Sequence, residues 1–216
     1  MNTESRDTGF DLVYADNSIL VLNKPSGLVS VPGRTPELQD SLSRRVQSVY
    51  PDACIVHRLD MDTSGILIMA RSSDAQRELG RMFMNRNIGK TYIAIVQGIV
   101  PRESGDIEFP LRPDWPNRPR QQVDFECGKP SLTRYRILGV DTEACTSRLE
   151  IEPVTGRTHQ IRIHLSTFGH PILGDRLYAP PDVRSRSCRL LLHAQSLHLQ
   201  HPVTGVRMQF ECTAPF

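Results

Sequence analysis

A run of polar residues that could carry out chemistry leads directly into an apolar segment. It reads His57-Arg58-Leu59-Asp60-Met61-Asp62-Thr63-Ser64-Gly65, and the apolar run 66–70 follows it. A carboxylate such as Asp60 can act as a nucleophile or as a general base, and a loop pressed against a buried strand holds such a group rigidly. Composition alone favours a simpler interpretation, a turn whose Asp and Thr side chains bond to the backbone.

Histidines near this loop and near a second polar segment raise the question of a metal site. His57-x-x-Asp60 and the pair His159 and His164 are the candidates. A spacing of five places the latter pair on different faces of a helix, unlike the i,i+4 pair of a zinc helix. The five cysteines are scattered and form no CxxC pair. The sequence therefore predicts hydrogen-bonding histidines, reduced and mostly structural thiols, and no metal.

The elements that must position Asp60 are predicted from hydrophobic patterns. The continuous run 66–70 indicates a central strand buried on both faces. The apolar runs 12–14 and 19–22, separated by four residues, predict a β-hairpin. Residues 37–50 are typical of a helix that ends at Pro51.

The rest of the chain is rich in predicted strands. Ser73 and Gln76 resemble a capping box, which predicts a helix with Ala75, Leu79, Met82 and Phe83 on one face. A second helix is predicted to place Ile161, Leu165 and Phe168 on one face. The predicted strands are 92–96, 106–111, 121–126, 132–140, 146–152, 190–199 and 206–212. We therefore expect an α+β fold with a mixed, mainly antiparallel central sheet, flanking helices and an active-site cleft across the sheet.

Composition gives weaker guidance about function. The net charge is +2, but Lys occurs at three positions only, so 23 of the 26 basic residues are Arg. Arginine suits phosphate and base contacts, although a GC-rich genome gives the same bias. No apolar stretch approaches the ~18 residues of a membrane helix. The N-terminus has no signal-peptide pattern, so we expect a cytoplasmic protein that does not enter membranes.

Several motifs resemble, in order, those of the RluA family of RNA pseudouridine synthases. The loop 57–65 is similar to that family's HRLDxxTSG signature, and Lys24-Pro25-Ser26-Gly27 to its KPxG element. Residues 90–94 (KTYIA) are similar to its KxYxA segment. The later segments 155–162 (TGRTHQIR), 170–175 (HPILGD) and 191–194 (LLHA) also match. The resemblance runs from about residue 11 to the end, so it implies a loose tail at 1–10, one catalytic domain at 11–216 and no additional S4-type domain.

The resemblance implies a role for individual residues. Asp60 is the catalytic carboxylate, and Arg157 is the cation that keeps it ionised and oriented. Tyr92 stacks on the target base, and Ile161 forms an apolar wall of the pocket. Arg58 helps to flip the base out of its stack or holds a phosphate, and Lys24 is a candidate RNA contact. Asp62 adds a second carboxylate whose role the resemblance does not explain.

The implied reaction needs no cofactor. Pseudouridine formation breaks the bond from ribose C1′ to uracil N1 and rejoins the base through C5, without a redox change. An ionised carboxylate beside C1′ could attack as a nucleophile or remove the C2′ proton to give a glycal. The sequence leaves both routes open.

The segments 31–34, 114–119 and 128–130 resemble dual-specificity members of the family. They imply two RNA partners: a 23S rRNA hairpin loop and the tRNA anticodon stem-loop, modified at the first nucleotide of the loop. We expect a monomer. Two alternatives remain open at this point, a non-catalytic RNA-binding protein and a glycoside or nucleoside hydrolase. The second would require two opposed carboxylates, for which Asp62 is the obvious partner of Asp60.

Overall fold

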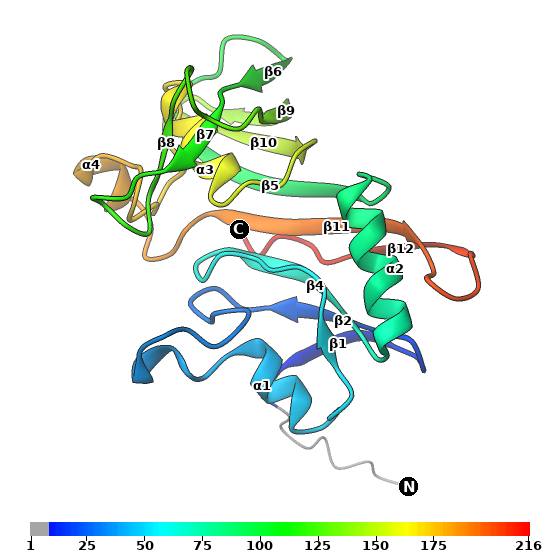
Figure 1. Cartoon of the computed structure of the whole chain (residues 1–216). Coiled ribbons are helices and arrows are strands. Elements are labelled where there is room, and N and C mark those ends of the chain that lie inside the picture. Colours follow the sequence, from blue (N-terminus) through cyan, green and yellow to red (C-terminus); the bar gives the residue numbers. More distant parts are fainter. Residues whose placement is uncertain (1–8) are drawn as a thin grey trace, which may run out of the picture. The chain divides into compact units, whose positions relative to one another are not determined.

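The computed structural model describes residues 9–216 of the chain (Figure 1). Most of the predicted tail, residues 1–8, lies outside the described residues. The described chain forms two compact units. Unit 1 contains the described residues up to Ile88 together with Leu197–Cys212, and unit 2 contains Gly89–Ser196 and Thr213–Phe216. The assignment of residues 11–216 to a single catalytic domain stays a prediction.

Unit 1 is built on an antiparallel sheet in which β2 (Ile19–Lys24) lies between β1 (Asp11–Ala15) and β4 (Ser64–Ala70). The short strand β3 (Cys54–Ile55) also pairs with β4. The predicted hairpin is confirmed, and Asp16 closes its turn by accepting hydrogen bonds from the backbone N–H groups of Ser18 and Ile19. Strand β12 (Arg207–Glu211) pairs with β11 (Leu192–Gln200), which belongs to unit 1 from Leu197 onward.

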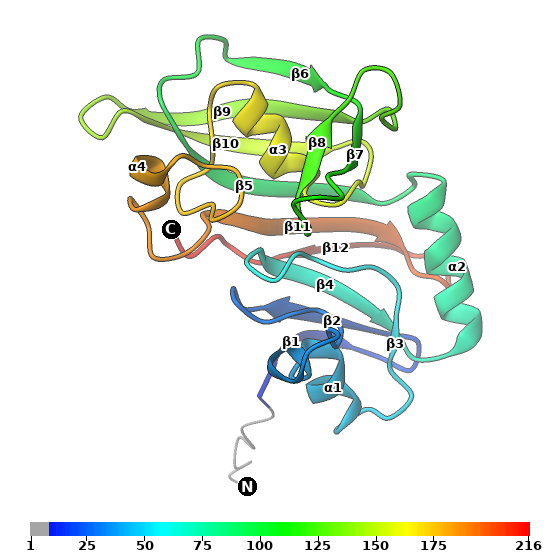
Figure 2. The same ribbon diagram turned by 60° about the vertical axis from the view of Figure 1, so that its left-hand side comes forward.

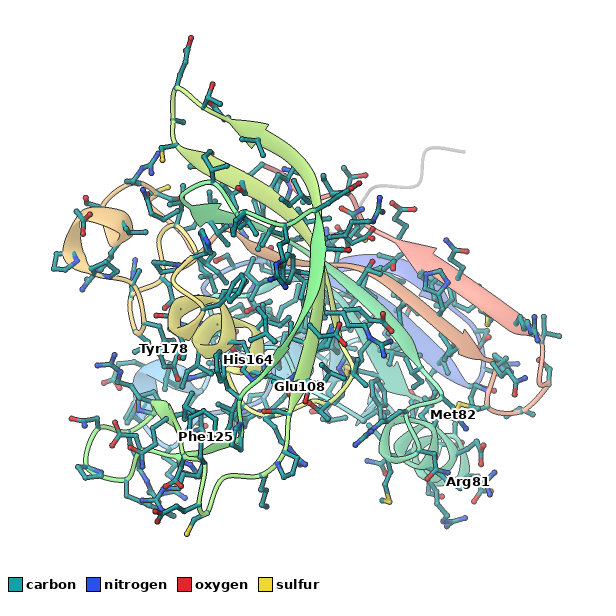
Figure 3. The ribbon with its side chains drawn as sticks, turned by 90° about the horizontal axis from the view of Figure 1, so that it is seen from above. Arg81, Met82, Glu108, Phe125, His164 and Tyr178 are labelled. Atoms are coloured by element: carbon teal, nitrogen blue, oxygen red, sulfur yellow. The ribbon has the colours of Figure 1, made fainter. Side chains whose placement is uncertain are left out.

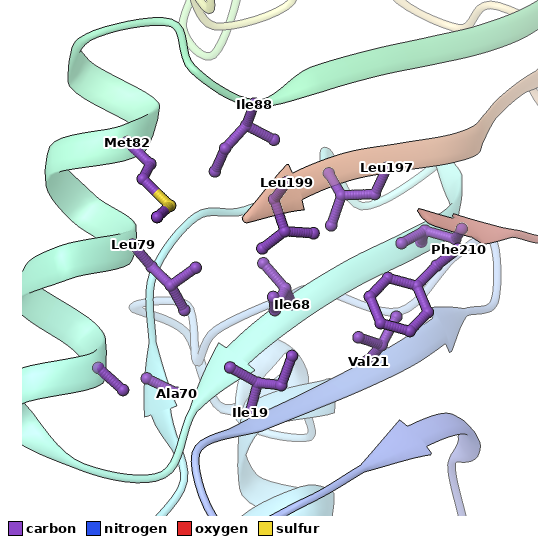
Figure 4. Close-up of a cluster of buried hydrophobic side chains, with 12 residues drawn as sticks. Ile19, Val21, Ile68, Ala70, Leu79, Met82, Ile88, Leu197, Leu199 and Phe210 are labelled. Atoms are coloured by element: carbon purple, nitrogen blue, oxygen red, sulfur yellow. The ribbon is translucent and has the colours of Figure 1, made fainter. Parts of the chain in front are cut away.

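The core of unit 1 forms around β4, which is apolar from Ile66 to Ala70 and buried at every residue. This confirms the prediction of a central strand covered on both faces. Helix α2 (Ser73–Met84) covers one face, where its Leu79 and Met82 point toward Ile68 (Figure 4). The helix begins one residue earlier than the predicted capping box allows. Ser72 is the N-cap, and Gln76 instead donates to the backbone carbonyl of Ile55.

The predicted helix 37–50 was too long. The structure has a single 3₁₀ turn at Pro36–Leu38 and a short helix α1 (Leu42–Gln47). The physical reason is Ser41, whose hydroxyl accepts a hydrogen bond from the backbone N–H of Arg44 and so caps a new helix start. Apolar residues continue at helical spacing on both sides of Ser41, so the pattern alone does not indicate where one helical segment ends and the next begins.

The strands of unit 2 pair antiparallel in the order β5–β10–β9–β6 (Figure 2). Its strands are β5 (Gly89–Gln97), β6 (Ser104–Glu108), β9 (Leu132–Asp141) and β10 (Thr146–Pro153). The predicted strand 106–111 is split, because Phe109 and Pro110 separate β6 from β7 (Leu111–Pro113). Strand β7 pairs with β8 (Gln121–Val123) in a separate two-stranded ribbon.

Helix α3 (Gln160–Thr167) lies against the sheet of unit 2, as predicted. Its Ile161 and Leu165 belong to a core that includes Ala94 and Ile151 from the strands. A short helix α4 (Pro181–Arg184) was not predicted from the sequence. Few helices and mainly antiparallel strands confirm the expected mixed α+β class.

Candidate active site

Asp60 lies in the loop between β3 and β4 of unit 1 and is half-buried. The loop turns tightly at this point, because the backbone N–H of Thr63 donates to the carbonyl of Asp60 at 3.2 Å. Thr63 and Ser64 are buried where the loop enters β4. The strand therefore fixes the C-terminal end of the loop.

Lys24, at the end of β2, holds the middle of the same loop. Its side chain is fully buried, and its ammonium donates to the carbonyls of Pro25 (2.8 Å), Leu28 (2.6 Å) and Met61 (2.9 Å). A buried ammonium is tolerated only when its donors are satisfied, and three carbonyls use all three N–H groups. A direct RNA contact by Lys24 would require its ammonium to leave these carbonyls.

Two serines of the segment 24–30 anchor the loop on both sides of Asp60. The hydroxyl of Ser30 donates to the carbonyl of Leu59 at 2.8 Å and accepts from its N–H at 3.1 Å. The hydroxyl of Ser26 donates to the carbonyl of Asp62 at 2.6 Å. The residues that flank Asp60 are thus bonded to side chains from another part of the chain. We did not single out these serines from the sequence, where their only signal was their place in and beside the KPSG motif.

The other candidates of the loop differ in exposure. Arg58 is exposed, as expected of a residue that meets RNA, while Leu59 beside it is buried. Asp62 is half-buried. His57 accepts a hydrogen bond from the backbone N–H of Ile68 at 3.1 Å, and its ring lies 4.5 Å from that of Phe83. This structural role for His57 was predicted.

The candidates in unit 2 lie on β5 and α3. Tyr92 of β5 is half-buried, pairs with Ile151 of β10 and packs against the core. Ile161 of α3 is 7% exposed and is itself a core residue. Lys90 lies two residues before Tyr92, so both side chains project from the same face of the strand. Burial lowers the pKa of Lys90, and the charge of Glu152 opposes this shift only in part.

Arg157 is exposed in the turn between β10 and α3. Its guanidinium makes a long hydrogen bond of 3.4 Å to the carbonyl of Pro130. Its backbone N–H donates to the side-chain oxygen of Gln160 at 3.0 Å. His159, between them, has left-handed backbone angles and bonds through Nδ1 to the hydroxyl of Tyr178 at 2.8 Å.

No part of the described chain, residues 9–216, brings together three or more His, Cys, Asp or Glu side chains in a group that could hold a metal ion. His164 is buried in α3, where Nε2 contacts the hydroxyl of Ser131 and the carbonyl of Phe109 (Figure 3). Together with His57 and His159, it confirms that these histidines are hydrogen-bonding groups of the fold. Over the same described residues, no helix is long and apolar enough to cross a membrane.

Two solved structures of proteins named for an RNA pseudouridylate synthase domain share this fold. The human RNA pseudouridylate synthase domain containing 1 aligns over 100% of this chain and 87% of its own, with a TM-score of 0.81 and 29% identity. The human RNA pseudouridylate synthase domain containing 4 shares the fold with a TM-score of 0.76, at 22% identity, over 95% of this chain and 88% of its own.

Sequence comparisons give the family directly. The family profile described as RNA pseudouridylate synthase matches residues 18–167. The dual-specificity RNA pseudouridine synthase RluA of Yersinia pestis is 49% identical over 95% of this chain and 99% of its own length. The enzyme of the same name from Escherichia coli K12 is 48% identical over 95% of this chain and 93% of its own.

The chain therefore belongs to the RluA family of RNA pseudouridine synthases, isomerases that convert uridine in RNA to pseudouridine. This confirms the resemblance drawn from the motifs. The family assignment also decides against the two alternatives, a non-catalytic RNA-binding protein and a glycoside or nucleoside hydrolase.

Proposed function

We propose that Asp60 is the catalytic carboxylate of this isomerase. The observation that carries the proposal is the anchoring of its loop: Ser30 bonds both backbone groups of Leu59, and Lys24 bonds the carbonyl of Met61. A reacting group held on both sides spends little energy on reaching its working geometry. The loop residues also match the family signature that bears the catalytic aspartate.

The chemistry assigned to Asp60 is balanced without any added group. The N1–C1′ bond breaks, a C5–C1′ bond forms, the proton at C5 leaves and N1 gains one. Asp60 attacks the sugar or the base as a nucleophile, or removes the C2′ proton, and it returns to its starting state after each turnover.

Four other residues complete the proposal. Arg157 keeps the Asp60 carboxylate ionised and oriented, since a guanidinium can bind a carboxylate through two parallel bonds. Tyr92 stacks on the flipped uracil, and Ile161 forms an apolar wall behind it. Arg58 contacts the RNA beside the target and helps to fill the gap left in the stack. Support comes from the exposure of Arg58 and from the placement of Tyr92 on a rigid strand.

We further propose that the enzyme has two RNA targets, a 23S rRNA hairpin loop and the first anticodon-loop nucleotide of tRNA. Relatives at 48% and 49% identity are named dual-specificity enzymes, and they align over nearly the whole of this chain. We propose that it acts in the cytoplasm as a monomer. Five free cysteines fit a reducing compartment.

The test is release of tritium from C5 of labelled uridine in tRNA and in 23S rRNA fragments, with wild type and Asp60→Asn side by side. Wild type should release tritium from both RNAs and form pseudouridine, whereas Asp60→Asn should release none. Asp62→Asn is the matched control, because it removes a carboxylate from the same loop, and it should keep most of the activity. Appreciable turnover by Asp60→Asn would remove Asp60 from the mechanism, and release from one RNA only would refute dual specificity.

The role of Tyr92 is tested by separating its ring from its hydroxyl. Tyr92→Phe keeps the stacking surface, which contributes about 1–3 kcal/mol per base, and Tyr92→Leu loses it. Tyr92→Leu should therefore lower the single-turnover rate of pseudouridine formation much more than Tyr92→Phe does. Equal rates for the two variants would show that stacking is not the function of Tyr92.

A further inference from the structure

The side chain of Gln160, the first residue of α3, is buried and uses every hydrogen-bonding position that an amide has. Its oxygen accepts from the hydroxyl of Thr155 at 2.7 Å and from the backbone N–H of Arg157 at 3.0 Å. Its nitrogen donates to the carbonyl of Leu132 at 2.9 Å and to the hydroxyl of Thr133 at 3.0 Å. A primary amide has two acceptor and two donor positions, so this one is satisfied in a single orientation.

The turn that Gln160 closes contains a strained residue. His159 has φ 54° and ψ 18°, a left-handed conformation that side-chain-bearing residues rarely adopt. Such a backbone persists only where its surroundings hold it. The bond from the Gln160 oxygen to the Arg157 N–H spans His159, so the amide ties together the residues on both sides of the strain.

A second bond supports the same turn from outside. The Nδ1 atom of His159 lies 2.8 Å from the hydroxyl of Tyr178, and that hydroxyl also accepts from the backbone N–H of Gln121 in β8. Figure 3 shows Tyr178 next to α3. Three segments of unit 2 thus converge on the turn, and Gln160 is the member that bonds directly to Arg157.

The side chain of Arg157 has weak support by comparison. It is exposed, and its hydrogen bond to the carbonyl of Pro130 is long, at 3.4 Å. The direction in which the guanidinium leaves the turn is therefore fixed mainly by the backbone of residues 155–160. A guanidinium that binds an anion through its planar fork needs that direction to be fixed, because its two bonds must be parallel.

We propose that Gln160 is a positioning residue for the reaction, acting through Arg157. This inference rests on the role of Arg157 in the proposed function. Gln160 does not touch the substrate in this account; it holds the backbone N–H of Arg157 and relieves the cost of the left-handed His159. A misplacement of about 1 Å can lower a rate about a hundredfold, so loss of the amide should lower kcat without removing the RNA-binding surface.

The experiment begins with Gln160→Ala, assayed by steady-state pseudouridine formation on an anticodon stem-loop RNA or a 23S hairpin RNA, whichever wild type modifies faster. We expect kcat to fall about tenfold to a hundredfold, with the KM for RNA changed by less than about threefold. Ile163→Ala is the matched control, since it removes a buried apolar side chain of the same helix that has no hydrogen-bonding group to offer the turn. It should lower the melting temperature but leave kcat within about twofold of wild type.

A double-mutant cycle with Arg157→Lys decides whether Gln160 acts through Arg157. If it does, the combined variant should be much less impaired than the product of the two single effects, because neighbours in one network are not additive. If the loss of activity in the double variant equals that product, the positioning role of Gln160 is overturned, while the proposed role of Arg157 is not affected. An Arg157→Lys variant as active as wild type would overturn both this inference and the role of Arg157.

A variant closer in shape covers the case in which Gln160→Ala does not fold. Gln160→Glu keeps an oxygen toward Thr155 and Arg157 but replaces the two N–H donors with an acceptor. The same cycle is then run with Gln160→Glu, and the same two outcomes support or overturn the inference.

Discussion

The loop that carries Asp60 and the turn that carries Arg157 are held in different ways. The Asp60 loop is bonded to Lys24, Ser26 and Ser30, which lie about thirty residues earlier in the chain. The Arg157 turn is bonded to Gln160, three residues later, within its own segment. The first arrangement exists only when distant segments of unit 1 have come together, whereas the second is partly local.

The two units also differ in how they stabilise their buried charges. In unit 1 the buried charge, the Lys24 ammonium, is shared among neutral carbonyls of the loop itself. In unit 2 the buried side chains of Arg162 and Asp175 form an ion pair, and Arg162 lies in the first turn of α3, two residues after Gln160. The buried charge of unit 1 therefore stabilises the Asp60 loop directly. The buried ion pair of unit 2 stabilises the fold around α3.

The largest expected loss of stability comes from breaking the ion pair of unit 2. Arg162 and Asp175 are 2% and 1% exposed and form two hydrogen bonds of 2.9 and 2.7 Å. Asp175→Asn leaves the guanidinium buried without its counter-charge, so the free energy of unfolding should fall by about 3–5 kcal/mol. Urea denaturation measures this loss. Asp106→Asn is the control, because its partner Arg134 is 3.6 Å away and both side chains are half-exposed; it should cost at most about 1 kcal/mol.

The same pair has a defined dependence on pH. Burial acts to raise the pKa of Asp175, but the bonds and charge of Arg162, with two backbone N–H groups, hold it below its ordinary value of 3.8. A carboxyl with a lowered pKa stabilises the fold above its unfolded pKa and loses that contribution as the pH falls through its folded pKa. In wild type the pair should therefore persist through mild acid, and Asp175→Asn should lack this part of the acid dependence.

An intermediate effect is expected in unit 1. Ser30→Ala removes the partner of both backbone groups of Leu59, a buried site, so it should cost about 2 kcal/mol of stability and also lower activity. Ser26→Ala removes one bond at a half-buried position and should cost about 1 kcal/mol or less. Unfolding and tritium release on both variants measure the two effects. If both variants lose the same stability and activity, the Ser30 bonds to Leu59 contribute no more than the single Ser26 bond to Asp62.

The smallest effect concerns His164. Burial lowers its pKa, and hydrogen bonds to the carbonyls of Phe109 and Ile107 oppose the shift. A histidine that is kept neutral in the folded state lowers stability once the pH falls below its unfolded pKa of about 6.5, since the unfolded chain then binds more protons. The urea midpoint should thus fall more steeply between pH 7 and 5 for wild type than for His164→Gln. Parallel pH profiles for the two proteins would contradict this.

Sequence reasoning succeeded where one pattern dominated. The continuous apolar run 66–70 predicted a central strand buried on both faces, and β4 is buried at every residue. The ordered motifs gave the family, which the relatives confirm, while the roles that they imply for Asp60 and Arg157 stay predictions. Reasoning failed where a single side chain overrode a pattern, as when Ser41 capped a helix inside the periodic segment 37–50. It also missed Ser30, because its partner Leu59 lies 29 residues away in the sequence. It missed the role of Gln160, because no rule of residue spacing predicts the orientation of a side-chain amide.

The saturation of Lys24 has a practical consequence for labelling. The chain has three lysines, Lys24, Lys90 and Lys129. The amine of Lys24 is buried and bonded to three carbonyls, so a reagent cannot reach its nitrogen, whereas Lys129 is exposed and Lys90 is half-buried with a lowered pKa. Among side chains, an acylating reagent should therefore mark Lys129 and Lys90 in the native enzyme and Lys24 only after unfolding. Peptide mass spectrometry of Lys24 would then serve as a built-in indicator of whether the Asp60 loop is intact.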